Sequence, residues 1–172
     1  MTKINVLKIY NNFKKYPFGK NVFTFFFCSQ APYFYTIIPK VEDLKPGHAS
    51  ISLKQRWILQ NMIKSVHALA VCNLVEACMG LVTEATLPSD LRWIPMGMEI
   101  AYEKKSYGKL TAHSDIDPNT FFKLEKYPGP VFVPVKVLNE AGETVSSAKI
   151  KVWISQAKTD EDKKQQKSNT QK

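Results

Sequence analysis

The sequence has few cysteines, no metal-ligand spacing and no long uncharged run near its start. Its three cysteines, Cys28, Cys72 and Cys78, are an odd number without CxxC spacing, which argues against a disulfide framework and a zinc site. The apolar stretch at 22–28 is far shorter than the ~20 residues that span a bilayer, and no signal-like pattern opens the chain. We therefore expect a cytoplasmic protein with no integral membrane segment and no metal site.

Arginine is also scarce, although the formal net charge is +9. Of the 24 basic residues only Arg56 and Arg92 are arginines, and all the others are lysines. Residues 1–20 and 158–172 carry +5 and +2 of that charge, which leaves +2 for residues 21–157. Proteins that recognise phosphates and bases favour arginine, because its guanidinium group can donate two parallel hydrogen bonds. No ribonucleoprotein motif is present either. We therefore interpret the positive charge as a property of solvent-exposed chain ends, and we expect no nucleic-acid partner.

The length of 172 residues, with 44% apolar and 23% charged residues, fits one globular domain with extensions. Loose helical spacing and an aromatic cluster predict an N-terminal helical extension at 1–30. The main domain is expected at 31–157. The segment 158–172 is almost entirely polar, which predicts a disordered tail.

Alternation of apolar and polar residues predicts strands on both sides of residues 66–84. Its clearest instances are the segments 49–54, 98–103, 110–112, 131–137 and 148–154. We expect 98–103 and 110–112 to form a hairpin around Gly108, and residues 140–143, with Gly142, to form another hairpin turn. The predicted order is two strands, a helix and about four strands.

The intervening segment 66–84 is too long for a strand, contains no proline and is apolar on nearly every side, so it predicts a buried helix. The short connections between the strands favour antiparallel pairing. The predicted fold class is α+β, with an antiparallel sheet of about six strands wrapped around one long buried helix.

Three polar residues interrupt this apolar helix: His67, Asn73 and Glu76. Because an unpaired buried carboxylate is costly, Glu76 needs a partner, which can be a purely structural lysine or backbone amide at a subunit edge. His67 and Glu76 lie nine residues apart, on opposite faces and roughly 13 Å apart along the axis. If both serve one site, that site combines two subunits.

The run 61–68, followed by Glu76, resembles the active-site segment of hotdog-fold acyl-CoA thioesterases of the phenylacetyl-CoA thioesterase type. In that group an asparagine precedes a His-Gly pair by six residues and a carboxylate follows the histidine by nine, which is the spacing of Asn61, His67 and Glu76 here. A wider similarity to an uncharacterised bacterial branch of such proteins covers about 17–157. It includes the segments 31–33, 44–47 and 92–95.

The resemblance implies a hotdog fold and hydrolysis of acyl-CoA or acyl-carrier thioesters. It implies that the backbone of Ala68 stabilises the oxyanion and that Glu76 of a second subunit activates water or attacks the thioester directly. It also implies that Asn61 holds the water or the carboxylate and that His67 orients the thioester. Ala68 stands where the family usually has glycine, and Glu76 stands where the phenylacetyl group has aspartate.

No cofactor is expected beyond the coenzyme A of the substrate, and the resemblance implies a homodimer or a dimer of dimers (a homotetramer). Lys104, Lys105 and Lys109 are candidates for binding its phosphates, although a solvated charge cluster also explains them. The alternative function is a non-catalytic acyl-CoA or lipid-binding hotdog protein.

Overall fold

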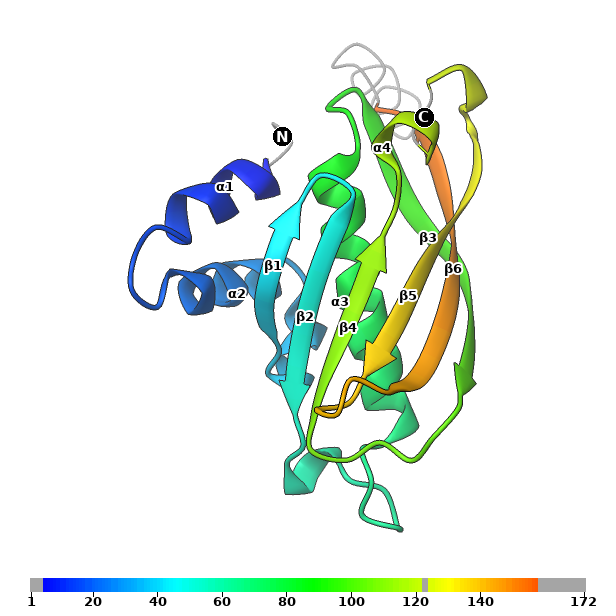
Figure 1. Ribbon diagram of the computed structural model, residues 1–172. Helices are drawn as coiled ribbons and strands as arrows, with labels where there is room; N and C mark the ends of the chain where they lie inside the picture. Colours follow the sequence, from blue (N-terminus) through cyan, green and yellow to red (C-terminus); the bar gives the residue numbers. More distant parts are fainter. Residues whose placement is uncertain (1–4, 122–123, 158–172) are drawn as a thin grey trace, which may run out of the picture.

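The computed structural model describes residues 5–121 and 124–157 (Figure 1). The tail predicted at 158–172 lies outside these residues. The helical elements are α1 (Val6–Phe13), α2 (Gly19–Gln30), α3 (Ala68–Thr86) and α4 (Pro118–Phe121), with 3₁₀ turns η1 (Pro32–Ile37), η2 (Trp57–Leu59) and η3 (Leu124–Lys126).

The strands form one sheet in the order β1-β2-β4-β5-β6-β3, and every neighbouring pair is antiparallel. Their bounds are β1 (Lys40–Lys45), β2 (His48–Lys54), β3 (Leu91–Tyr102), β4 (Lys109–Asp115), β5 (Gly129–Leu138) and β6 (Thr144–Gln156). The predicted order of two strands, a helix and four strands is confirmed. Figure 1 shows the sheet curving around α3.

The hairpin predicted between 98–103 and 110–112 is wrong. Strand β3 pairs with β6, whereas β4 pairs with β2 and β5, so the connection around Gly108 crosses from one edge of the sheet to its middle. Alternation identifies the buried face of a strand but not its neighbour. The turn predicted at 140–143 is confirmed, because β5 and β6 pair around it and Gly142 has φ +78°.

Helix α3 fills the concave side of the sheet. Its first residue follows the N-cap His67, and its C-cap Leu87 is extended before Pro88, as residues before proline tend to be. Thirteen of its 19 residues are buried. Among the described helices, α3 alone is long and apolar enough to cross a membrane, and its packing inside the protein accounts for that composition.

The two outer strands of the sheet have different surroundings. Helix α2 packs on β1, where the hydroxyl of Thr24 accepts a hydrogen bond of 3.0 Å from the Val41 N–H and the Lys20 ammonium donates to the Glu42 carbonyl. Helix α1 supports α2 through an edge-to-face contact of Tyr10 with Phe23. At the opposite edge β3 pairs only with β6 among the strands described.

Candidate active site at the start of the central helix

A cavity of about 320 Å³ opens at the N-terminal end of α3. Its walls come from the loop before the helix, the first turns of the helix and the segment that follows β3. The lining residues are Asn61, Ser65, Val66, Ala68, Val71, Tyr102, Glu103, Lys104, Lys105 and Ser106. The structure thus brings Asn61, Ala68, Lys104 and Lys105 of the predicted site together.

The Asn61 side chain organises the loop that precedes α3. Its Oδ1 accepts hydrogen bonds of 3.1 Å from the N–H groups of Ile63 and Ser65, and its Nδ2 donates to Ser65 Oγ at 2.8 Å. An amide nitrogen has two N–H bonds, so one donor remains for a ligand. Asn61 therefore holds the loop in shape and still faces the cavity.

His67 is the N-cap of α3. Its Nδ1 accepts a hydrogen bond of 3.1 Å from the Leu69 N–H, and this acceptor role assigns the proton of the neutral ring to Nε2. The ring is exposed and lies beside an adjoining hollow, which is lined by Gln60, Asn61, Met62 and Ile63. His67 thus caps the helix with one nitrogen and has a donor available at the other.

Ala68 supplies the first helical N–H of α3. The first N–H groups of a helix have no partner within the helix, and the Leu69 N–H is satisfied by His67. For the Ala68 N–H, the structure records no acceptor within residues 5–121 and 124–157. Ala68 lines the cavity, at the end of the helix where the helix dipole adds partial positive charge. The position suits a carbonyl oxygen that gains negative charge.

Tyr102 and Cys72 join this region, and the sequence analysis assigned them no functional role. The Tyr102 hydroxyl lies 2.9 Å from the Cys72 thiol and donates to the Ala68 carbonyl at 3.3 Å. Burial, together with the hydrogen bond and charge of Cys72, raises the pKa of Tyr102 to about 12, so the phenol is neutral near pH 7. It ties the end of β3 to the first turn of α3.

Glu76 does not reach this cavity in a single chain. It lies eight residues after Ala68, or roughly 12 Å along the helix axis. Its side chain is exposed, so the burial expected from its apolar neighbours is wrong. Leu69, Cys72 and Glu76, at positions i, i+3 and i+7, form one surface of the helix, and the sheet does not fully cover it.

The three predicted phosphate-binding lysines divide between two places. Lys104 and Lys105 lie at the cavity, and Lys104 forms an ion pair of 2.6 Å with Glu143. Lys109 instead lines a different cavity, where it pairs with Glu42 at 2.9 Å. The separation follows from the topology, because β4 inserts between β2 and β5 and not beside β3.

A six-stranded antiparallel sheet wrapped around one long helix is the hotdog fold, and solved structures with this fold match the chain. A crystal structure solved as a genomics target is 30% identical, with a TM-score of 0.76, and the match covers 88% of this chain and 99% of that one. The chain belongs to the family described as a domain of unknown function, DUF4442, whose model matches residues 19–154.

More distant hotdog structures carry functional descriptions. A protein of unknown function from Pseudomonas aeruginosa, described as a probable thioesterase, is 17% identical with a TM-score of 0.70, over 76% of this chain and 91% of that one. A mutant of the phenylacetic acid degradation protein PaaI from Thermus thermophilus is 16% identical with a TM-score of 0.59, over 71% and 97%. No curated protein matches.

Proposed function

We propose that the protein hydrolyses acyl-CoA or acyl-carrier thioesters in a site completed by a second copy of the chain. The observation that carries this proposal is the unpaired N–H of Ala68 at the start of α3, in a residue that lines the same cavity as Lys104 and Lys105. The description of a hotdog relative as a probable thioesterase supports the same chemistry.

The oxyanion forms at the start of α3. With the thioester oxygen against the Ala68 N–H, water attacks the carbonyl carbon and negative charge develops on that oxygen. One such donor contributes about 3 kcal/mol to transition-state stabilisation in other enzymes. The Nε2–H of His67 and the remaining N–H of Asn61 orient the substrate. The thiol of coenzyme A or of the acyl carrier is the leaving group, and no other cofactor takes part.

The carboxylate of Glu76 from the second copy acts as the base. It accepts a proton from the attacking water as the C–O bond forms. When the tetrahedral intermediate collapses, the C–S bond breaks and the departing sulfur takes that proton. The products are a carboxylic acid and free thiol, so atoms and charge balance.

The edge of β3 is where we place the second copy. Ile94 and Met96 on this strand are each 58% exposed, and Leu69 on the neighbouring face of α3 is 67% exposed. Pairing of two β3 edges about a two-fold axis places the two α3 helices antiparallel and side by side. Glu76 of one copy then lies near Ala68 of the other. The assembly is a homodimer or a dimer of such dimers, in the cytoplasm where acyl-CoA occurs.

The test offers the purified protein a panel of acyl-CoAs and follows free coenzyme A by chromatography. Glu76→Gln keeps the shape of the side chain but removes the base, and we expect a loss of turnover of at least about 100-fold. The matched control is Glu125→Gln, at an exposed glutamate on η3. No hydrolysis of any substrate, or equal turnover by both variants, refutes the proposal.

A non-catalytic acyl-CoA or lipid-binding protein is the second candidate, favoured by Ala68 at a position where similar thioesterases usually have glycine. The added methyl group restricts how closely a ligand approaches the backbone. A binding protein takes up acyl-CoA, releases no coenzyme A, and keeps its affinity in Glu76→Gln. The same panel, with binding measured by calorimetry, separates the two functions.

A further inference from the structure

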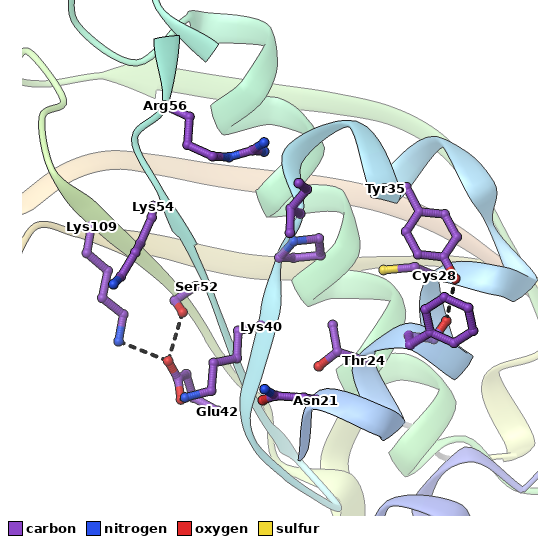
Figure 2. A pocket seen from close by; sticks show the side chains of 13 residues that line it. Asn21, Thr24, Cys28, Tyr35, Lys40, Glu42, Ser52, Lys54, Arg56 and Lys109 are labelled. Carbon is purple, nitrogen blue, oxygen red and sulfur yellow. Dashed lines mark hydrogen bonds and ion pairs between the residues drawn. The ribbon is translucent and has the colours of Figure 1, made fainter. Parts of the chain in front are cut away.

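A second and larger cavity, of about 530 Å³, lies between α2, η1 and the β1 side of the sheet (Figure 2). Its lining comes from α2, η1, β1, the end of β2 and the start of β4, and it shares no residue with the cavity at Ala68. Cavities of 300–1,000 Å³ are typical of sites for small organic ligands. The size alone does not identify the ligand, whose chemistry must match the residues that line the cavity.

One side of the cavity is apolar. It is formed by Phe25 and Cys28 of α2, Tyr35 of η1 and the following Ile38 and Pro39. Burial raises the pKa of the Cys28 thiol to about 11, so it remains protonated and contributes an uncharged wall. Phe25 and Ile38 are 67% and 62% exposed, although neither has a polar group that favours water. An apolar ligand body removes this surface from water.

The opposite side is cationic. Among the described residues, Glu42 is the only carboxylate that lines it. Glu42 accepts hydrogen bonds from Lys109 at 2.9 Å and from Ser52 at 2.8 Å. Burial alone would raise the pKa of Glu42, but these hydrogen bonds and the nearby ammonium charges outweigh it and lower the pKa to about 2. Glu42 is therefore ionised, and its carboxylate already has partners, which include Lys40 at 3.4 Å.

Two further cationic side chains line the cavity and have no carboxylate partner among the described residues. Lys54 and Arg56 line it, and neither forms an ion pair within residues 5–121 and 124–157; the Arg56 guanidinium makes only a long contact of 3.5 Å to the Thr36 carbonyl. Lys54 is also directly opposite Lys109 across the β2–β4 ladder. Like charges in this position repel each other, and a bound anion relieves that repulsion.

We propose that this cavity binds an amphipathic anion, with a carboxylate or phosphate head at Lys54 and Arg56 and an apolar body against Phe25 and Ile38. Lys40 and Lys109, the two lysines paired with Glu42, also line the cavity. This site is separate from the thioester site and does not depend on hydrolysis.

The test measures binding of decanoate and decyl phosphate to the full chain by calorimetry, with decanol and acetate as probes that lack the charge and the apolar body. We expect saturable binding of at least one of the two anions. Decanol and acetate should bind at least about tenfold more weakly, as expected when a charge-assisted hydrogen bond or the apolar contact is missing.

The paired substitutions Lys54→Gln and Arg56→Gln should weaken binding of that anion by at least about tenfold. Lys45→Gln, which removes an exposed charge from β1 outside the cavity, should change it less than about twofold. Thermal unfolding followed by circular dichroism checks that each variant is folded. Equal binding by the paired variant and the control overturns the proposal.

Methyl NMR locates the bound anion. We expect the Ile38 and Thr24 methyl signals to shift on titration, in the wild type and equally in Glu76→Gln. Shifts confined to Ala68 and Val71 would place the anion in the thioester site and overturn the proposal, as would the absence of saturable binding. Failure of acyl-CoA hydrolysis has no effect on this result, so the two proposals fail independently.

Discussion

Strands β1 and β3 both lie at an edge of the sheet, but among the described residues other parts of the chain cover only β1. Thr24 and Lys20 of α2 hydrogen-bond to the β1 backbone, and Tyr10 of α1 packs on Phe23 behind them. On β3, Ile94 and Met96 are each 58% exposed. Because exposed apolar edges promote pairing with other chains, proteins usually cover them. This difference is the basis of the proposal that the β1 side is complete within one chain and that a second copy covers β3.

The largest effect is expected from removal of the proposed oxyanion donor, the Ala68 N–H, on the β3 side. Ala68→Pro deletes the N–H at the first helical position, where proline is tolerated, and His67 already has the extended backbone that precedes proline comfortably (φ −62°, ψ 139°). We expect kcat to fall about 10²–10³-fold with little change in Tm. Ala68→Gly keeps the N–H and should keep the activity. Wild-type kcat in folded Ala68→Pro would show that this amide takes no part.

The second prediction breaks the open edge itself. Ile94→Lys combined with Met96→Lys places four like charges in a two-fold β3 interface, and we expect self-association to weaken at least about 100-fold. Because both side chains are more than half exposed in one chain, the fold should survive. Sedimentation velocity measures the assembly and coenzyme A release measures activity. An unchanged assembly, or an active monomer, contradicts the role given to β3.

The third prediction concerns a hydrogen bond between α2 and the β1 edge. Thr24→Val preserves the shape of the side chain but leaves the Val41 N–H without its acceptor, in a place where Thr24 is only 6% exposed. The free energy of unfolding should fall by about 1–3 kcal/mol. Thr24→Ser retains the hydroxyl and should lose less. Urea unfolding of the three proteins compares them, and equal stability of Thr24→Val and the wild type would mean that α2 does not secure this edge.

The smallest effect concerns the charge network beside β1. The pKa of Glu42 is lowered from 4.5 to about 2, so its contribution to stability is present above pH 4.5 and is lost as the pH falls towards 2. Glu42→Gln should therefore be less stable by about 1 kcal/mol at pH 7, and the difference should shrink below pH 4.5. Unfolding curves over this range test the sign. A difference that grows on acidification contradicts it.

Local sequence patterns were sufficient for most elements of the fold. Alternation identified β2, β4, β5, β6 and the second half of β3, and the length and apolar surface of 66–84 identified the buried helix. Alternation did not identify β1, whose burial does not alternate. The partners of β3 and β4 were not predictable in this way, because pairing depends on contacts between residues far apart in the chain. The wrong hairpin around Gly108 has this cause.

The candidate site was predictable only in part. The resemblance of the run 61–68 to a thioesterase active-site segment assigned Asn61 and Ala68 to one site, and the structure places both at one cavity. The exposure of Glu76 was not predictable, because it depends on how much of α3 a single sheet covers. Tyr102 was assigned only as a strand residue, since nothing in the sequence shows that β3 ends at the start of α3.

The central claim is that two chains share each thioester site, and complementation between inactive variants tests it most directly. Ala68→Pro and Glu76→Gln are co-expressed, so that mixed dimers contain one site with an intact amide from one chain and an intact carboxylate from the other. Random pairing should restore about a quarter of wild-type thioester hydrolysis. A mixture that is no more active than its two components, although mixed dimers are present, would contradict the account.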